Sequence, residues 1–319
     1  MAKINDVEFS DLYITPGKHA YMWSGKSQYG LKEAAFDDYA TFLKAVEAGF
    51  KTNPSYSVMY EKHSYRVERT IALNGAQYCV RKMPTLIPFV KDLGMPDPGA
   101  RHLQSLGKSS GLILIAGATG SGKSTTLAAL LKDYLLNEGG YAFTIEDPIE
   151  LPLDGVYRGP TGELGLCKQT TPINDNWKES LKSALRSCPR YIMLGEIRST
   201  EVAAEALQAA TSGHLVLSTI HANSVPDAVN ALVKYAAAST ISEDMAYDLV
   251  STSILACLHQ KLTGIPKRLM LNFLFANPVV EEACQVRGAI KLGKLNFATM
   301  MEQQQIKLLN GQKLFGSKR

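Results

Sequence analysis

The residues best suited to chemistry in this sequence form a glycine-rich stretch of the kind that binds phosphate. Eight residues, GATGSGKS, fit the pattern G-x-x-x-x-G-K-[ST] and stand between an apolar run and a helical one. Glycines let backbone N–H groups turn toward an anion, and the following helix N-terminus adds a favourable dipole. Lys123 suits the β and γ phosphates of a nucleoside triphosphate, and the Ser124 hydroxyl suits Mg²⁺. We therefore predict a nucleotide-binding loop made of Gly117, Ala118, Thr119, Gly120, Ser121, Gly122, Lys123, Ser124 and Thr125.

Acidic residues follow two of the predicted strands, and nucleotide hydrolysis needs carboxylates. The first cluster is Ile145-Glu-Asp-Pro-Ile-Glu150, and the second is Gly195-Glu196. Ligand sites of parallel sheets lie at the carboxyl ends of the strands, so both clusters should approach the glycine-rich loop. The second cluster resembles a Walker B strand with Gly-Glu in place of Asp-Glu. The alternative for either cluster is a solvated or helix-capping acid.

Two histidines, His214 and His221, bracket the strand predicted at Leu215–Thr219. Histidine can sense a γ-phosphate or position a neighbouring group by hydrogen bonding. No cysteine or acid lies at ligand spacing from them, which argues against a metal site. From chemistry alone, a structural role for both histidines is an equal alternative.

The elements that must position these residues alternate between strands and helices. Short apolar runs bounded by turn or polar residues are typical of buried parallel strands, and segments with helical apolar spacing separate them. The pattern predicts an α/β domain with a mainly parallel sheet. After about residue 240 we expect helices and a basic tail. The predicted strands are Leu112–Ala116, Tyr141–Ile145, Tyr191–Leu194 and Leu215–Thr219, and the predicted helices are Ser124–Asn137, Trp177–Arg186 and Glu201–Ser212.

A linker is predicted at residues 93–100, where two prolines and two glycines fall within LGMPDPGA. It separates an N-terminal domain, residues 1–92, from a C-terminal domain, residues 101–319. The N-terminal domain reads as a small α+β unit, with helical apolar spacing at Asp37–Ala48.

The N-terminal domain also holds a predicted β-hairpin, in which Tyr65–Leu73 and Ala76–Met83 flank Asn74-Gly75. A type I′ turn at Asn74-Gly75 sets Glu68 opposite Arg81. A cross-strand ion pair between them, worth about 0.2–1 kcal/mol, is the alternative to a functional role for Arg81. The hairpin then has a polar face that includes Arg66 and Arg81, and an apolar face made of Tyr65, Val67, Ile71, Leu73, Tyr78 and Val80.

Composition sets limits on the class of protein. The chain has 319 residues, is 45% hydrophobic and carries a net charge of +4, which does not by itself demand nucleic acid or acidic lipid. Its five scattered cysteines form no C-x-x-C pair, so a disulfide framework or a four-cysteine zinc site is disfavoured. The N-terminus has no apolar signal core, and no run of about eighteen apolar residues occurs. We expect a cytoplasmic protein without a transmembrane segment.

The sequence resembles the secretion ATPases, the hexameric motors of type II secretion, type IV pili and type IV secretion. The N-terminal Ser10–Ile14 is similar to the family's S-D-L-H-[IL] start, and the resemblance runs from about residue 10 to about residue 294. The family's Walker A motif, Asp box, Walker B motif and His box correspond in order and spacing to Gly117–Thr125, Ile145–Glu150, Gly195-Glu196 and Gly213–His221.

The resemblance implies a fold and a set of catalytic roles. The family pairs a PAS-like N-terminal domain with a RecA-like ATPase domain and binds ATP at the cleft between them. Glu150 would be the catalytic carboxylate that activates water. His221, and with it His214, would link the nucleotide state to the sheet. Mg²⁺ would be held by Ser124, Glu146 and Glu196.

Three arginines match positions of the family pattern. Arginines on strands of the N-terminal domain reach phosphates in the family, and Arg66 and Arg81 correspond to them. Arg186 stands where the family often has L-R-x-D-P-D. Here Cys188-Pro-Arg190 replaces the acidic tripeptide. The replacement leaves open which contacts form at that edge, whereas the family's fold is still expected.

Within the family, the chain lacks the four-cysteine zinc insertion and the long N-terminal extension of many pilus-assembly and type II motors. It is therefore more similar to the PilT-like retraction motors and the DotB-like ATPases of type IV secretion. The long segment Gly155–Asn176 and the His box Ser218–Asn223 favour the DotB-like branch, which conjugative plasmids also carry. The implied partners are other copies of the chain in a homohexamer and inner-membrane components of the machine, to which it would bind peripherally.

Two other classes stay open. RecA-like hexamers include nucleic-acid translocases, and the basic tail Lys307–Arg319 permits one, although no aromatic stacking array supports stable nucleic-acid binding. A nucleotide-dependent switch without useful turnover is the other class, and the presence of Glu150 argues against it.

Overall fold

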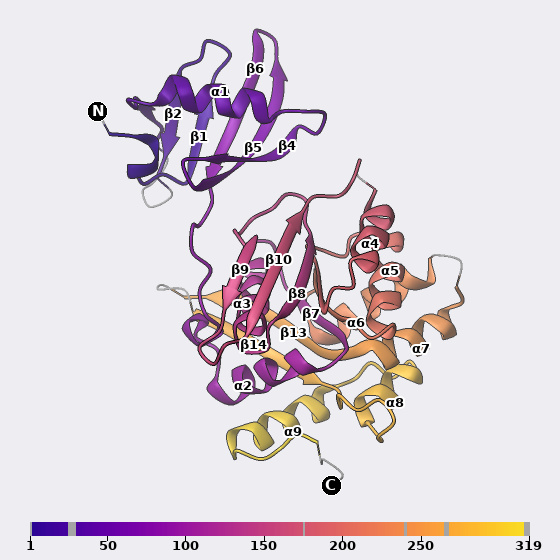
Figure 1. The fold of residues 1–319 in the computed structure, drawn as a ribbon. Helices are drawn as coiled ribbons and strands as arrows, with labels where there is room; N and C mark the ends of the chain where they lie inside the picture. Colours follow the sequence, from indigo (N-terminus) through magenta and orange to yellow (C-terminus); the bar gives the residue numbers. More distant parts are fainter. Residues whose placement is uncertain (1, 25–29, 175, 239–240, 265–267, 316–319) are drawn as a thin grey trace. The chain divides into compact units, whose positions relative to one another are not determined.

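The computed structural model describes residues 2–24, 30–174, 176–238, 241–264 and 268–315 (Figure 1). The chain divides into two compact units. The first unit comprises Met1–Ile87 together with Asp147–Pro152, and the second comprises Pro88–Glu146 together with Leu153–Arg319.

The segment predicted as a linker, residues 93–100, is only partly irregular. Gly94 takes a left-handed conformation with φ 72°, but helix α2, Asp97–Ser105, begins three residues later. Pro98 lies in the first turn of α2, where a proline costs no helix hydrogen bond because the first N–H groups have no partner within the helix. The Gly-Pro composition therefore marks the start of a helix, and the two units divide earlier, between Ile87 and Pro88.

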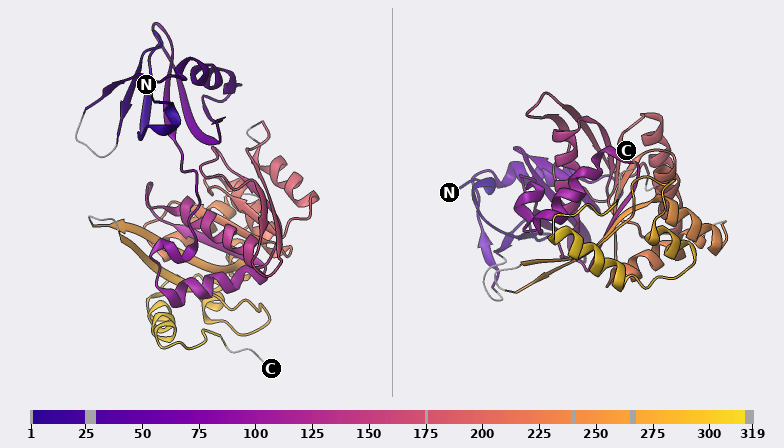
Figure 2. Two further views of the ribbon diagram at one scale, coloured as in Figure 1. Left: turned by 60° about the vertical axis from the view of Figure 1, so that its left-hand side comes forward. Right: turned by 90° about the horizontal axis from the view of Figure 1, so that it is seen from below.

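The first unit is a six-stranded antiparallel sheet with one α-helix (Figures 1 and 2), a small α+β fold as the sequence predicts. Helix α1, Tyr39–Gly49, buries Phe42 and Val46, and Phe42 meets Tyr65 edge to face at 4.9 Å between ring centroids. Burying one such large side chain stabilises the fold by roughly 1.5–3 kcal/mol. The sheet has the order β3-β2-β1-β6-β5-β4, and its elements are η1 (Ile4–Asp6), β1 (Asp11–Ile14), β2 (Ala20–Trp23), β3 (Lys32–Ala34), β4 (Ser55–Tyr60), β5 (His63–Ala72) and β6 (Gly75–Lys82).

The predicted hairpin forms between β5 and β6, but the predicted register is wrong. The turn comes one residue earlier than predicted, so each residue of β5 faces a β6 residue two positions before the predicted partner. The turn residues are Leu73 and Asn74, because Ala72 already pairs with Gly75. Glu68 consequently lies opposite Cys79, and Arg66 lies opposite Arg81. The predicted ion pair between Glu68 and Arg81 does not form. Gly75 takes φ 125°, a conformation that glycine tolerates after the turn as well as within it.

The two faces of the hairpin are predicted correctly only near its base. Tyr65, Val67 and Val80 are buried in the core, whereas Ile71 and Leu73 near the turn are exposed. Alternation sets the face of each side chain, but burial ends where the hairpin extends past the rest of the unit. Arg66 and Arg81 do share the polar face, as their direct pairing requires.

The second unit is an α/β fold around an eight-stranded mixed sheet, in which the inner pairs are parallel and both outer pairs antiparallel. All six residues of β7, Gly111–Ala116, are buried, as expected of a central parallel strand covered on both faces. Figure 1 shows α3 on one face of the sheet and α4 to α6 on the other.

The four predicted strands and three predicted helices of this unit form within one residue of their expected bounds. The sheet order is β14-β13-β7-β12-β11-β8-β10-β9. The other strands are β8 (Gly140–Ile145), β9 (Gly155–Arg158), β10 (Leu164–Thr170), β11 (Tyr191–Leu194) and β12 (Leu215–Ile220), and the helices are η2 (Val90–Leu93), η3 (Leu106–Lys108), α3 (Lys123–Asn137), α4 (Trp177–Arg186), α5 (Thr200–Thr211), α6 (Val225–Ala237), α7 (Glu243–Ser253), α8 (Gln285–Lys291) and α9 (Ala298–Leu309).

The expectation that the chain is helical after residue 240 is wrong for one stretch. Strands β13, Ile254–Thr263, and β14, Arg268–Phe275, form an antiparallel pair that extends the sheet beyond β7. The run Ile254–Leu258 is continuously apolar, and such a run fits a buried strand or a buried helix equally well from periodicity alone. No helix among the described residues is long and apolar enough to cross a membrane.

Candidate nucleotide-binding site

The predicted nucleotide-binding loop connects the central strand β7 to α3. Gly117 and Gly122 both have positive φ, 152° and 85°, so a side chain at either position would be strained. At Gly117 a Cβ atom would also lie 2.7 Å from Ser121 Oγ, which is too close for any real contact. The loop is compact for this reason, and it leaves Ala118, Thr119 and Gly120 exposed. Such a loop ahead of a helix N-terminus is an anion-binding arrangement.

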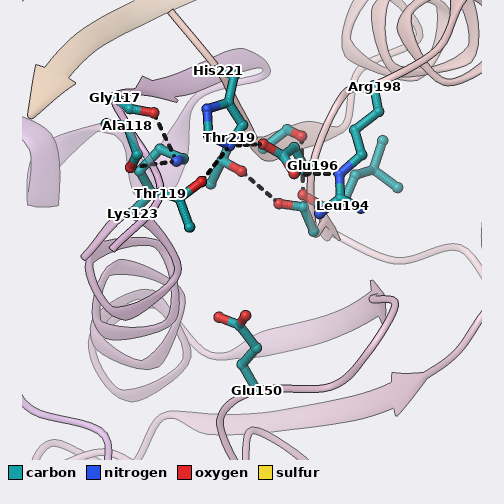
Figure 3. A network of polar contacts seen from close by, with 12 residues as sticks. Gly117, Ala118, Thr119, Lys123, Glu150, Leu194, Glu196, Arg198, Thr219 and His221 are labelled. Atoms are coloured by element: carbon teal, nitrogen blue, oxygen red, sulfur yellow. Dashed lines mark hydrogen bonds and ion pairs between the residues drawn. The ribbon is translucent and has the colours of Figure 1, made fainter. Parts of the chain in front are cut away.

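Lys123 begins α3 and turns back over the loop (Figure 3). Its Nζ donates hydrogen bonds to the carbonyl oxygens of Gly117 at 2.8 Å and Ala118 at 3.0 Å. The ammonium group is thus held at the loop, and it is buried. A positive charge in this place, at the N-terminus of a helix, favours binding of a polyphosphate.

A chain of polar contacts connects the loop to the ends of two neighbouring strands (Figure 3). Thr119 Oγ1 lies 3.2 Å from His221 Nε2, and the same Nε2 lies 3.3 Å from Glu196 Oε1. Arg198 donates from its Nε to Glu196 Oε2. His221 follows β12 and Glu196 follows β11, and these strands come next to β7 in the sheet. The carboxyl ends of parallel strands therefore bring three of the predicted site residues together.

Hydrogen bonds between β11 and β12 fix the positions of Glu196 and His221. The Ser218 hydroxyl donates to the Leu194 carbonyl at 2.9 Å, and the Thr219 hydroxyl donates to the Gly195 carbonyl at 2.7 Å. Both bonds cross from β12 to the residues just before Glu196. Buried side-chain bonds of this kind hold a strand end more rigidly than the ladder alone.

Glu146 comes at the end of β8, the strand next to β11. Its Oε1 accepts hydrogen bonds from the Thr144 hydroxyl at 2.7 Å and from Gln169 Nε2 at 2.8 Å. The backbone of the neighbouring strand approaches closely, because the Gly195 N–H donates to the Ile145 carbonyl at 2.9 Å. Glu146 is buried, and these two donors offset part of the cost of burying its carboxylate.

The other predicted carboxylate, Glu150, belongs to the first unit. Its Oε1 lies 3.5 Å from Arg66 Nη1, and the neighbouring Ile149 carbonyl accepts a hydrogen bond from the Ser57 hydroxyl at 3.1 Å. Both partners come from the paired strands β4 and β5. Glu150 and Arg66 are each more than a third exposed, so their ion pair is weak and either group can take another partner.

Arg81, the second predicted arginine, is held by a residue that sequence reasoning did not single out. Its Nε donates to Asp11 Oδ1 at 2.8 Å, and the Ser10 hydroxyl donates to Asp11 Oδ2 at 2.7 Å. Asp11 is 2% exposed and lies directly opposite Arg81 in the pairing of β1 with β6. This hydrogen bond raises the pKa of Arg81 above its usual value. The Ser10–Ile14 motif contains Asp11, and an acid at the start of a buried strand was the available signal.

His214 and Arg186 are among the predicted residues that lie outside the network of Thr119, His221 and Glu196. His214 lies at the amino end of β12, opposite to His221, and its Nδ1 is 2.7 Å from the Pro189 carbonyl. This contact connects the start of β12 to the segment before β11. Arg186 is exposed in the last turn of α4. Arg198, which sequence reasoning missed, does join the network through Glu196.

The residues proposed to hold Mg²⁺ fit that ion in one specific respect. Glu196 Oε1 is buried and accepts no hydrogen bond in the described part of the chain, although His221 Nε2 is near. An oxygen with that open capacity is suited to a hard cation. Among the described residues no group of three or more His, Cys, Asp or Glu is arranged as a metal site. A Mg²⁺ ion that takes most of its ligands from phosphate and water needs no such group.

A P-loop between a central parallel strand and a helix, with an acid and a histidine at the ends of the next strands, defines a P-loop nucleoside triphosphatase. A family model described as type II/IV secretion system protein matches residues 57–302. The chain belongs to that family, the secretion ATPases.

Individual relatives agree with this assignment. The type II secretion system protein E of Pectobacterium carotovorum is 39% identical over 173 residues, which are 53% of this chain and 31% of that protein. The solved structure of the Legionella pneumophila ATPase DotB has a TM-score of 0.73 at 21% identity and covers 96% of this chain and 89% of its own. The crystal structure of the pilus retraction motor PilT with bound ADP has a TM-score of 0.71 at 24% identity, covering 98% and 91%.

These likenesses confirm the predicted fold class, a P-loop α/β unit preceded by a small α+β unit, and the predicted family. The match to the curated relative is partial, since the chain spans about a third of that protein's length.

Proposed function

We propose that this chain is an ATP-hydrolysing motor of a DotB-like type IV secretion or conjugation system. The observation that carries the proposal is the chain of contacts from Thr119 through His221 to Glu196. It joins the phosphate-binding loop to the ends of β12 and β11 within one unit. A movement of the loop would therefore change the contacts of the Glu196 carboxylate, which would face the metal.

Each predicted site residue of the second unit that lies near the loop has a defined role in the proposal. The N–H groups of Gly117–Thr125 and the ammonium of Lys123 bind the phosphates of ATP, and Lys123 exchanges the Gly117 and Ala118 carbonyls for phosphate oxygens. Ser124, Glu146 and Glu196 would hold Mg²⁺. Mg²⁺ would neutralise charge on the β and γ phosphates. His221 lies between Thr119 and Glu196 and would couple movement of Thr119 to the position of the Glu196 carboxylate.

The first unit supplies the groups that complete hydrolysis in this proposal. Glu150 accepts a proton from the attacking water, and Arg66 and Arg81 neutralise the phosphates. The exposed ion pair of Arg66 with Glu150 fits these roles, because both side chains are already held near each other and neither is committed to a buried partner. Asp11 uses only the Nε of Arg81, which leaves the terminal nitrogens of the guanidinium to bind an anion.

Membership of the family supports a proposal for the assembly and its location. We propose a homohexamer that binds inner-membrane components of the machine from the cytoplasmic side, with ATP binding and hydrolysis moving neighbouring subunits. The long segment after the Asp box, which forms β9 and β10, supports the DotB-like branch in this proposal. A PilT-like retraction ATPase is the second candidate, favoured by the similar TM-score to PilT.

The test of the activity is ATP turnover by the purified chain with Mg²⁺. The wild type should release phosphate slowly, Lys123→Ala should lose nucleotide binding, and Glu150→Gln should keep binding but lose at least about a hundredfold in kcat. The matched control is Glu68→Gln, an exposed acid on the same polar face as Arg66. Turnover of Glu150→Gln equal to the wild type would remove Glu150 from the mechanism.

A separate measurement distinguishes the machine. Deletion of the gene in its host should abolish type IV secretion or conjugation and leave pilus retraction intact. Loss of retraction alone would favour the PilT-like candidate. ATPase stimulation by single-stranded DNA, with the salt dependence of phosphate contacts, would instead favour a nucleic-acid translocase.

A further inference from the structure

The phosphate-binding loop packs against strand β13, which is the neighbour of β7 in the sheet but lies far from it in the sequence. Strand β13 runs parallel to β7, and their last paired residues are His259 and Ala116. Gly117 starts the loop just after Ala116, so Gln260, the next residue of β13, lies alongside the loop. Gln260 is 1% exposed, which makes it one of the most deeply buried polar residues of the unit.

The side chain of Gln260 binds the loop directly. Its Nε2 donates a hydrogen bond to the Ser121 carbonyl at 2.6 Å. A carbonyl oxygen can only accept, so the amide must present its NH₂ group to Ser121. The other amide atom, Gln260 Oε1, is buried and has no hydrogen-bond donor among the described residues. Burying Oε1 without a donor costs free energy, and the hydrogen bond from Nε2 to the Ser121 carbonyl offsets part of this cost.

Gln260 also touches both ends of the loop. A Cβ atom on Gly117 would lie 2.4 Å from the Gln260 carbonyl oxygen, and a Cβ on Gly122 would lie 3.0 Å from Gln260 Nε2. Glycine at these two positions is what allows β13 to approach the loop so closely. Backbone and side chain of one residue thus set where the loop begins and where it turns into α3.

We propose that Gln260 is a positioning residue for nucleotide binding. In a trans peptide the C=O and N–H groups point in opposite directions. The bond from Gln260 pulls the Ser121 carbonyl toward β13, and this aims the N–H of Gly122 away from β13. Gly122 directly precedes Lys123, so the aimed N–H belongs to the part of the loop that receives phosphate. Gln260 acts through the loop and touches no phosphate itself.

This inference rests on the proposed nucleotide-binding function. The inference adds a residue outside the loop motif to those needed for binding. A loop with every motif residue present can still have its N–H groups pointing away from the phosphate. A purely structural Gln260 would stabilise the free protein and its ADP complex to the same extent. A positioning Gln260 stabilises the complex more, so removing it weakens ADP binding beyond its effect on the free protein.

The test is the Kd of the full chain for Mg²⁺-ADP, together with the Tm of the free protein. Gln260→Met keeps the length of the side chain and removes the donor, and Gln260→Asn keeps the amide but is too short to reach Ser121. Both should bind ADP about tenfold more weakly than the wild type, which corresponds to 1.4 kcal/mol. The matched control is Lys261→Met, an exposed neighbour on β13, which should bind like the wild type.

The outcomes separate the inference from the proposal beneath it. Wild type that binds ADP, Lys123→Ala that does not, and folded Gln260 variants within twofold of wild type would overturn the role of Gln260 alone. Absence of ADP binding by the wild type would overturn both. A Gln260→Met chain that fails to fold leaves the decision to Gln260→Asn, whose smaller change is milder for the core.

Discussion

His221 and Glu196 meet at the ends of neighbouring strands, with His221 Nε2 lying 3.3 Å from Glu196 Oε1 and 3.2 Å from Thr119 Oγ1. A ring nitrogen carries one hydrogen or one lone pair, so Nε2 serves one of these partners at a time. Movement of Thr119 when the loop binds phosphate would therefore release or engage Glu196. This shared nitrogen connects the loop to Glu196.

Removal of the His221 ring should slow turnover and leave nucleotide binding nearly intact. In His221→Ala, Glu196 Oε1 loses the ring nitrogen that lies 3.3 Å away and Arg198 stays at Oε2. Loss of a supporting neighbour of a proposed metal ligand costs roughly tenfold to a hundredfold in activity. We expect kcat to fall by that amount while the Kd for ADP changes less than threefold. Steady-state phosphate release and a fluorescence titration with ADP measure the two quantities.

The matched control for His221→Ala is His214→Ala. Both histidines flank β12, but His214 contacts the Pro189 carbonyl at the amino end of the strand, away from the loop. We expect His214→Ala to lower the Tm by a few degrees with kcat within twofold of the wild type. Equal losses of kcat in the two variants would show that the effect comes from β12 as a whole and not from the shared nitrogen.

The pair of Arg81 and Asp11 should respond asymmetrically to mutation. Arg81→Met leaves the buried Asp11 carboxylate without its ionic partner, whereas Asp11→Asn leaves the half-exposed Arg81 in contact with water. We expect Arg81→Met to destabilise the first unit by about 1–2 kcal/mol, a value kept below that of a fully buried pair because water reaches Arg81. Adding Asp11→Asn to Arg81→Met should recover part of the loss, since no buried charge remains.

The two tryptophans allow this measurement in the full chain. Trp23 lies on β2 in the first unit and Trp177 begins α4 in the second. In a Trp177→Phe background, tryptophan fluorescence during urea unfolding reports the first unit alone. A double mutant less stable than Arg81→Met would show that Asp11 is not left as an uncompensated charge.

The sequence is a better guide to single elements than to contacts between them. Strands β7, β8, β11 and β12 were predictable because each is a buried apolar run between turn residues. The partners of Arg81 and Ser121 were not, since Asp11 and Gln260 reach them only through the pairing of strands far apart in the sequence. Arg198 is two residues from Glu196, but the sequence pattern did not single out this local contact. The motif fixed the identity of the loop, but its support came from β13, which periodicity alone did not distinguish from a helix.

The hairpin error has a more local cause. Asn74-Gly75 strongly favours a two-residue turn at those positions. The structure instead leaves Leu73 and Asn74 in the turn, and Gly75 already pairs with Ala72. Both registers place Tyr65, Val67 and Val80 on the same face, but the observed register sets Val67 directly opposite Val80. Packing of this buried cross-strand pair favours the observed register over the turn preference.

Burial of His102 should make the second unit sensitive to acid. His102 lies on α2, with its ring edge to face with Phe275 at 4.5 Å and its Nε2 buried without a hydrogen-bond partner among the described residues. Burial lowers the pKa of His102 from 6.5 to about 4. The unfolded chain therefore binds this proton more readily than the folded chain between those two values. The stabilising contribution of neutral His102 is complete above about pH 6.5 and is lost as the pH falls toward 4.

The loss of stability on acidification is at most about 3 kcal/mol, because each unit of pKa difference between the unfolded and folded chains corresponds to about 1.4 kcal/mol. Urea unfolding followed by Trp177 in a Trp23→Phe background, at pH 7.5, 5.5 and 4.5, measures it. His102→Met fills a similar space and does not titrate, so its stability should fall less than that of the wild type over the same range. Parallel pH profiles for the two proteins would contradict a neutral, buried His102.

Loss of the Arg287 side chain should strongly destabilise the C-terminal region. Its guanidinium is buried, and Nη1 donates to the carbonyls of Ser251 and Thr252 while Nη2 donates to the Asn277 carbonyl at 3.0 Å. Ser251 and Thr252 lie in the last turn of α7, where carbonyl groups have no partner within the helix. Arg287 thus caps α7 and connects it to the loop after β14, and burial lowers its pKa below the usual arginine value.

Arg287→Met leaves these three carbonyls without their donor, and each buried acceptor that loses its bond costs about 1–3 kcal/mol before relaxation. We expect the free energy of unfolding of the second unit to drop by roughly 2–4 kcal/mol, measured by Trp177 fluorescence in urea. Arg287→Lys should recover less than half of the loss, because one ammonium on a linear chain does not reproduce the planar fork that spans α7 and Asn277. The matched control is Lys291→Met, an exposed cation on the same helix α8, which should stay within about 0.5 kcal/mol of the wild type. Full recovery by Arg287→Lys would mean that the positive charge alone, and not the geometry of the fork, stabilises the end of α7.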